Sequence, residues 1–165
     1  MNDELRRLFE ADQGDRESDA LSGFRTDPDA AMAVFERDRA RRVRVAEILD
    51  AGGAETADDY YWAAMVFQHG QEIASPRRAY ELALRALSID PAHEKARWLA
   101  AAAMDRELVR RGQLQRYGTQ FFVDDEGRWS LSPFDPAVTD EERARWNVRP
   151  LAEALRLVDE NNRKK

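Results

Sequence analysis

Residues 58–121 read DDYYWAAMVFQHGQEIASPRRAYELALRALSIDPAHEKARWLAAAAMDRELVRRGQLQRYGTQF, and this stretch decides the fold. Apolar residues recur in it at the three- and four-residue spacing of amphipathic helices. Two prolines, Pro76 and Pro91, open new segments, and Gly112 closes the third segment. Proline in a first turn and glycine after a last turn are typical helix boundaries. The stretch therefore predicts three consecutive helices, over residues 57–70, 75–88 and 92–111.

The sequence before this stretch predicts two more helices. Residues 1–11 have the pattern of a short amphipathic helix, whereas residues 12–26 are polar, contain two glycines and indicate a loose connection. An aspartate and a proline then start a long helix over residues 27–50, which a Gly-Gly pair ends.

The sequence after the stretch changes in character. Residues 120–123 and 128–131 read as two short strands joined by DDEG. Two helices with good start signals follow, one capped by Thr139 and one beginning at Pro150. Residues 161–165, NNRKK, read as a frayed tail.

These segments together predict a mainly α fold, a helical bundle with a small β-hairpin near the C-terminus. We expect a single helical domain over residues 27–160, preceded by the N-terminal helix and loose connection of residues 1–26. Small residues at Ala79 and Ala86, followed by Pro91, resemble the second half of a tetratricopeptide repeat. No second unit recurs about 34 residues later, so the resemblance implies one tetratricopeptide-like helical hairpin rather than a solenoid.

Composition and charge exclude several classes of protein. The 165 residues are 43% hydrophobic and 35% charged, which is typical of a soluble globular domain and offers no membrane span. The sequence contains no cysteine, so disulfides and thiolate metal sites are excluded and a cytoplasmic location is expected. A net charge of −6 argues against a dedicated nucleic-acid binder. Five arginines between Arg37 and Arg44 could bind phosphate, but a solvated face paired with acidic residues is the favoured interpretation.

Polar residues interrupt the apolar pattern where a plain helical hairpin would not need them. Asp105 lies on the apolar stripe of its helix, where a carboxylate needs donors. His69 and Asp105 could form an oriented base, and Arg106 could hold an anionic group. Amide and hydroxyl groups for ligand contacts would come from Gln68, Gln115, Tyr117, Thr119 and Gln120.

The segment containing Tyr117 is expected to fold back against the helix ends that carry His69 and Asp105, because few residues separate it from Gly112. His69, the loop amides and the Tyr117 hydroxyl would then be the candidate donors to the Asp105 carboxylate. Trp62, Trp98 and Leu99 are predicted to share one core. The other histidine, His93, follows Pro91 and is expected to be solvated.

Three motifs carry a second resemblance. The chain has a QH pair at residues 68–69, a DR pair at 105–106 and YGTQ at 117–120, with an upstream glutamine. Between about Asp38 and Glu153 it resembles a family of bacterial proteins of unknown function that share these motifs in this order. The resemblance implies no activity, substrate or cofactor.

Two hypotheses on function follow. The first is an interaction or accessory module that uses a repeat-like groove to bind another protein or a peptide. The alternative is a small enzyme or ligand-binding protein whose site gathers His69, Asp105, Arg106 and the loop of residues 117–120. The residues present support no metal, no cofactor and no common covalent nucleophile, and they do not predict the oligomeric state. Candidate side chains that line an open cleft would favour the enzyme, whereas buried and mutually bonded ones would favour the module.

Overall fold

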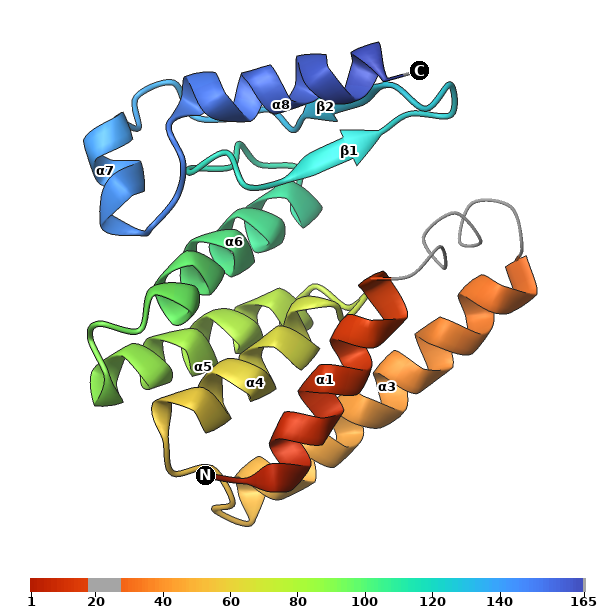
Figure 1. The fold of residues 1–165 in the computed structure, drawn as a ribbon, viewed down its shortest axis with the longest axis vertical. Coiled ribbons are helices and arrows are strands. Elements are labelled where there is room, and N and C mark those ends of the chain that lie inside the picture. The colour runs from red at the N-terminus through yellow and green to blue at the C-terminus, as the bar shows by residue number, and fades with distance from the viewer. Residues whose placement is uncertain (18–27, 165) are drawn as a thin grey trace.

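The computed structural model describes residues 1–17 and 28–164. Within these residues the fold is mainly α, with one two-stranded antiparallel sheet near the C-terminus, as the sequence predicts (Figure 1). Among them, no helix combines the length and the apolar character needed to cross a bilayer. In chain order the elements are α1 (Asp3–Glu17), α3 (Pro28–Asp50), α4 (Ala57–Gln68), α5 (Ala74–Ile89), α6 (Glu94–Arg110), β1 (Phe121–Val123), β2 (Trp129–Leu131), α7 (Asp140–Arg145) and α8 (Leu151–Arg163).

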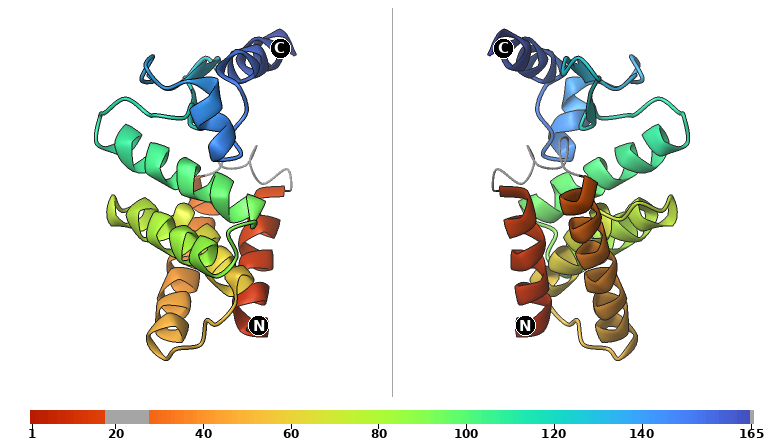
Figure 2. Two further views of the ribbon diagram at one scale, coloured as in Figure 1. Left: turned by 90° about the vertical axis from the view of Figure 1, so that its left-hand side faces the viewer. Right: turned by 90° about the vertical axis from the view of Figure 1, so that its right-hand side faces the viewer.

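The helices α4, α5 and α6 pack in succession and form the centre of the molecule. Helices α1 and α3 cover α4 on one side, while α7, α8 and the β-hairpin lie beyond α6 at the other end (Figures 1 and 2). Helix α6 therefore separates an N-terminal group of helices from the C-terminal elements.

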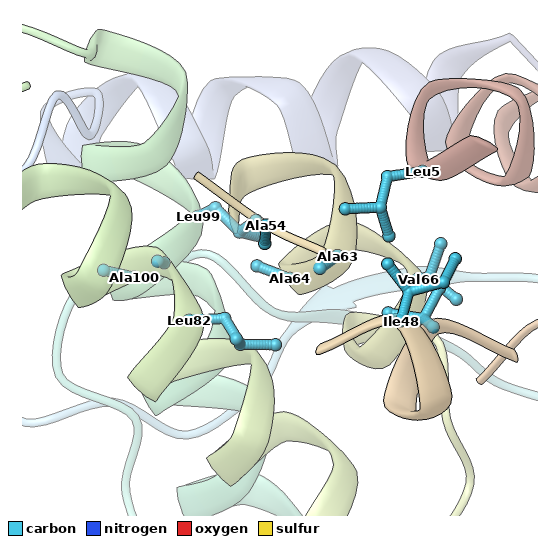
Figure 3. Close-up of a cluster of buried hydrophobic side chains, with 11 residues drawn as sticks. Leu5, Ile48, Ala54, Ala63, Ala64, Val66, Leu82, Leu99 and Ala100 are labelled. Carbon is cyan, nitrogen blue, oxygen red and sulfur yellow. The ribbon is translucent and has the colours of Figure 1, made fainter. Parts of the chain in front are cut away.

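One buried cluster joins the first five helices. Leu5, Ile48, Val66, Leu82 and Leu99 come from α1, α3, α4, α5 and α6 respectively, and each is at most 6% exposed (Figure 3). Small side chains between them let neighbouring backbones approach closely, which favours tight helix packing. These small residues are Ala63, Ala64, Ala83 and Ala100.

Helix α1 is longer than the sequence predicts. The expected end near residue 11 is wrong, because the helix continues to Glu17 through part of the predicted loose connection. Asp12 and Arg16, one turn apart, make contacts with each other and with neighbouring helices that stabilise this extension. The rest of the predicted connection and the expected cap at Asp27 lie outside the described residues.

Helix α3 ends as predicted at Asp50, where Gly52 takes a positive φ of 73°. Its arginine-rich face contacts α1. Arg37 and Arg41 both pair with Asp15, and Arg44 pairs with Glu4 at 2.7 Å. The predicted pairing with the acidic first segment is therefore confirmed for Arg44, and the predicted pairing with Asp38 is confirmed for Arg41 at 3.0 Å, whereas Asp15 belongs to the predicted loose connection.

Two helix starts differ from prediction. Helix α5 begins at Ala74, with Ile73 as its N-cap, and Ser75 already lies within the first turn. His93 is not solvated as expected, because its side chain is only 10% exposed and caps α6. Its Nδ1 accepts a hydrogen bond from the Ala96 N–H, and its Nε2 lies 3.2 Å from an Asp58 carboxylate oxygen.

The C-terminal elements are held together across the hairpin. Strands β1 and β2 pair in antiparallel register, with Phe122 opposite Ser130, and α8 packs against β2. The predicted frayed tail is wrong for residues 161–163, because α8 continues to Arg163. Asn162 within this last turn exchanges hydrogen bonds with the Trp129 backbone, which anchors the helix end to the sheet.

The predicted core of Trp62, Trp98 and Leu99 is only partly correct. Leu99 is fully buried and Trp62 packs against the same cluster, but Trp98 is 40% exposed. Trp98 lies next to Leu99 on α6 and lines a small cleft with Val148 and Arg149 instead. Leu99 and Ala100 of α6 belong to the central cluster, whereas Trp98 lies beside the connection between α7 and α8.

Candidate functional site

The Asp105 carboxylate is the centre of the first polar group. Its side chain is fully buried on α6, and the loop that contains YGTQ wraps around it. The carboxylate accepts hydrogen bonds from three backbone N–H groups and from one hydroxyl. The donors are Arg116 N at 2.7 Å, Tyr117 N at 3.0 Å, Thr119 N at 3.1 Å and Thr119 Oγ1 at 2.8 Å.

The predicted return of the YGTQ segment to α6 is therefore confirmed. Of the donors that the sequence predicts, the loop amides satisfy the carboxylate, together with the Thr119 hydroxyl, whereas His69 contacts Asp12 instead. Gly118 allows this wrapping because it has a φ of 79°, a conformation that side-chain-bearing residues rarely adopt.

Gln115 stabilises the same loop through hydrogen bonds of its side-chain amide. Its fully buried side chain donates from Nε2 to the carbonyl oxygens of Gln120 and Ser132, at 3.0 and 2.7 Å. Its Oε1 accepts from Gln120 N at 2.8 Å. The backbone of Gln115 also pairs with residues 133 and 135, so the amide lies between the loop and the segment that follows β2.

Arg106 connects this loop to the end of α4. Its Nε donates to Gln120 Oε1 at 2.9 Å, and its Nη1 donates to the Gln68 carbonyl oxygen at 2.8 Å. Burial lowers the pKa of Arg106 to about 10, with smaller contributions from the nearby charges of Arg110 and Arg16. The guanidinium therefore remains charged at neutral pH and bridges the YGTQ loop to the end of α4, which lies 38 residues before Arg106 in the chain.

The second polar group surrounds His69, the C-cap residue of α4. Its Nδ1 lies 2.8 Å from Oδ2 of Asp12, a fully buried carboxylate on α1. The expected partner, Asp105, is occupied by the loop on α6. Burial lowers the pKa of His69 and outweighs the opposing effect of Asp12, while Arg16 and Arg106 contribute to the lowering.

Sequence analysis missed the ion pairs that extend this second group. Arg16 lies 3.0 Å from Asp12 and 2.7 Å from Asp38, and Arg41 joins Asp38 to Asp15. These contacts tie α1 to α3 beside the His69 ring. The four-residue spacing of Asp12 and Arg16 was the available signal, because such pairs face the same side of a helix.

Arg143 of α7 is a further buried residue that the sequence did not reveal. It is 2% exposed, and its Nε donates to the carbonyl oxygen of Tyr117 at 3.2 Å. Its Nη1 donates to the Val138 carbonyl oxygen at 2.8 Å. The Tyr117 ring packs against Trp146, with 5.9 Å between ring centroids. The YGTQ loop is thus held between α6 and α7.

The eight candidate residues do not form one catalytic constellation. Asp105 directs its oxygens at loop donors, and His69 contacts a different carboxylate on the other side of Arg106. Arg106 and the two glutamines Gln115 and Gln120 link backbone segments to each other. In the described part of the chain, no three His, Cys, Asp or Glu side chains are placed to hold a metal ion.

An open groove lies beside the loop, between α7 and the turn that joins α5 to α6. Its volume is about 560 Å³, and of the eight candidates only Tyr117 contributes to its lining. Apolar surface dominates, and charged side chains complete the wall. The lining residues are Leu87, Pro91, Arg97, Tyr117, Glu142, Arg145 and Trp146.

Comparisons with known proteins identify no relative: no family model, curated protein or solved structure matches this chain. The resemblance to the bacterial family that shares the QH, DR and YGTQ motifs remains a prediction from the sequence.

Proposed function

We propose that this protein is an interaction module that binds a segment of a partner protein in the groove between α7 and the α5–α6 turn. The observation that carries the proposal is the composition of this groove. Leu87, Pro91, Tyr117 and Trp146 supply an apolar lining to which one or two partner side chains could bind. Tyrosine and tryptophan are enriched at the centres of protein interfaces, which supports this assignment.

The charges around the groove favour an acidic partner segment. Arg97 and Arg145 contribute cations, whereas the one anion, Glu142, pairs with Arg116 at 2.8 Å. Complementary charges at the edge of an interface direct association and fix orientation. The partner class that fits is therefore a peptide with apolar side chains next to carboxylates.

The hydrogen bonds that the DR motif and Gln115 make within the chain give the module further support. Asp105, Arg106 and Gln115 bond to loops and helix ends, so their polar groups are already used in positioning the groove wall that contains Tyr117. The alternative, a small enzyme or ligand-binding protein built on His69 and Asp105, has less support because these two side chains face separate partners.

A selection from a random peptide library on the purified full chain tests the proposal. We expect enriched peptides to combine apolar and acidic residues and to bind with dissociation constants below 1 mM, roughly the weak end of specific recognition. Fluorescence polarisation then compares the wild type with the double variant Arg97→Glu, Arg145→Glu. The double charge reversal should weaken binding by about tenfold or more, because repulsion replaces attraction at the groove edge.

The matched control is Arg156→Glu, a charge reversal at an exposed position of α8 away from the groove. This variant should bind the selected peptides within about twofold of the wild type. Equal weakening by the control, unchanged binding by the double variant, or no enriched peptide at all would each contradict the proposal. Far-UV circular dichroism of every variant checks that the fold is retained.

A further inference from the structure

A buried arginine lies where α3 passes the turn between α4 and α5. Arg42 is 6% exposed, and neither Nη1 nor Nη2 has a hydrogen-bond partner among the described residues. Its aliphatic stem packs so closely against the turn that a Cβ atom added at Gly70 would lie 3.0 Å from Arg42 Cδ. A buried cation whose N–H groups lack acceptors is destabilising unless another group satisfies them.

The surroundings of Arg42 are positive. Arg110 of α6 donates from Nη1 to the carbonyl oxygen of Glu72 at 3.0 Å, which places its guanidinium at the same turn. Helix α5 begins at this point, and its N-cap residue Ile73 provides no side-chain hydrogen bond. The N-terminal end of a helix carries partial positive charge and free N–H groups, which attract anions.

The nearest anion is a carboxylate that is held loosely. Glu72 Oε2 lies 3.4 Å from Arg42 Nη2, without hydrogen-bond geometry, and accepts one hydrogen bond from Ser75 Oγ at 2.9 Å. The Glu72 side chain is 59% exposed, so it can turn into solvent without disturbing the core. Hydrogen bonds from its own backbone and from Ser75 lower the pKa of Glu72, with Arg42 and Arg110 adding to the effect.

We propose that Arg42, Arg110, Ser75 and the N-terminal end of α5 form a binding site for a small oxyanion of the phosphate class. In this site the Glu72 carboxylate occupies the ligand position until the oxyanion displaces it. An arginine fork presents parallel N–H groups that match two oxygens of such an anion, and a helix N-terminus adds further donors. The site differs from the proposed peptide groove, which lies at the other end of α5, roughly 20 Å away along the helix axis.

Removing the internal carboxylate tests the site directly. The variant Glu72→Ala should bind inorganic phosphate at least tenfold more tightly than the wild type in isothermal titration calorimetry at constant ionic strength. Adding Arg42→Met to this variant should abolish the gain, because the methionine fills similar space without donors. Acetate, titrated in parallel, distinguishes a site for tetrahedral phosphate from one that accepts any carboxylate.

The matched control is Arg39→Met in the Glu72→Ala background, since Arg39 is an exposed arginine on the same helix. Phosphate affinity should stay within about twofold in this control. An unchanged affinity in Glu72→Ala, or an equal gain in the presence of Arg42→Met, would overturn the proposal. A gain for acetate that equals the gain for phosphate would overturn the phosphate class.

The melting temperature of Arg42→Met shows whether Arg42 serves a ligand site or stabilises the fold. Because neither Nη atom of Arg42 has a hydrogen-bond partner among the described residues, Arg42→Met should melt at the same temperature as the wild type or higher. A strongly lowered melting temperature would assign Arg42 to the fold and overturn the site. A second test is Arg42→Lys in the Glu72→Ala background. This substitution keeps the positive charge but removes the two parallel N–H groups of the guanidinium, so it should lower phosphate affinity at least threefold.

Discussion

Asp105 shows at the scale of a single residue how a buried charge specifies a loop. Its two oxygens accept from the backbone N–H groups of Arg116, Tyr117 and Thr119 and from one hydroxyl, so the carboxylate fixes the path of residues 116–119. A neutral side chain of the same shape could not replace it, because an amide nitrogen would face N–H groups. The charge is therefore a structural requirement of the YGTQ loop.

We predict that Asp105→Asn lowers the free energy of unfolding by about 3 kcal/mol, through lost charge-assisted hydrogen bonds and a donor facing donors. Thr119→Val, which removes only the hydroxyl, should lower it by about 1 kcal/mol. Urea denaturation measures both, with Asp125→Asn at an exposed position of the β-hairpin turn as the control. A loss below about 1 kcal/mol for Asp105→Asn would show that the loop holds its path without the carboxylate.

The lowered pKa of His69 predicts that the stability of the protein depends on pH. Its pKa in the folded protein is below the ordinary value of 6.5, chiefly because of burial. The unfolded chain therefore takes up a proton at a higher pH than the folded protein, and stability falls as pH decreases below about 6.5. The fall ends once the pH is below the pKa of the folded state.

Urea denaturation at pH 7.5 and at lower pH values checks this sign. His69→Gln removes the ionisable ring, so the slope of stability against pH below about 6.5 should be smaller than in the wild type. The variant also loses the contact to Asp12, which lowers the free energy of unfolding at every pH. The test therefore compares only the slopes of stability against pH, not the absolute stabilities. Parallel slopes for the two proteins would contradict the prediction.

At the residue scale, predictions from the sequence succeed where the type and position of a side chain show which hydrogen-bond partners it requires. Asp105 is predictable because a carboxylate on an apolar stripe requires donors. The loop amides are predictable as a class of donor, but not which of them bond to the carboxylate, because every residue except proline carries a backbone N–H group. The His69–Asp12 contact was missed for another reason: Asp12 belongs to a polar stretch whose helical continuation depends on contacts with α3.

At the scale of elements, α8 and the β-hairpin stabilise each other. A two-stranded hairpin is marginal alone, and strands of three residues are especially short. Helix α8 covers β2, and Asn162 closes its last turn against the Trp129 backbone with hydrogen bonds of 2.7 and 3.0 Å. The helix end and the strand are therefore expected to open together.

Asn162→Ala should test this coupling. We expect a loss of about 1 kcal/mol in stability, because the two hydrogen bonds are exposed to solvent. Amide hydrogen exchange at residues 129–131 should become faster, since the Trp129 N–H loses its acceptor. The control is Asn161→Ala, whose side chain bonds only to its own helix at Leu157. Equal effects of the two substitutions on β2 exchange would show that Asn162 does not link helix and strand.

Element boundaries were predictable where local chemistry decides them. Glycine at position 52 and threonine at position 139 mark the end of α3 and the start of α7 through a positive φ and a side-chain cap, both of which are local signals. The ends of α1 and α8 were not predictable from the sequence, because the side chains of Arg16 and Asn162 bond to residues more than 20 positions away. Such distant partners leave no trace in the spacing of the sequence.

At the scale of the whole molecule, a series of buried and partly buried contacts runs from the first helix to the last third of the chain. Leu5 and Asp12 join α1 to the central helices, and Arg106 links the end of α4 to the YGTQ loop. Arg143 then holds that loop from α7. Because these contacts connect the two ends, a disturbance at one end should destabilise the other, and we expect the chain to unfold as one cooperative unit.

The substitution Leu5→Ala tests whether the chain unfolds as one cooperative unit. Leu5 is fully buried, so its truncation should lower the free energy of unfolding by about 3 kcal/mol. Two probes follow the same urea transition: far-UV circular dichroism reports all helices, and fluorescence reports Trp146 in a background with the other three tryptophans changed to phenylalanine. Both probes should give one midpoint, shifted equally by Leu5→Ala, although Trp146 lies beyond α7 and far from α1 in the chain.

The control for this experiment is Arg7→Ala, an exposed position on the same helix, which should leave both midpoints within about 0.5 kcal/mol of the parent. If Leu5→Ala shifted only part of the circular dichroism signal and left the Trp146 transition in place, α1 would be a separate unit. The division at residue 26 expected from the sequence would then be correct. A common shift instead places α1 in the same cooperative domain as α7, because only a shared folding transition transmits the loss of a core side chain over that distance.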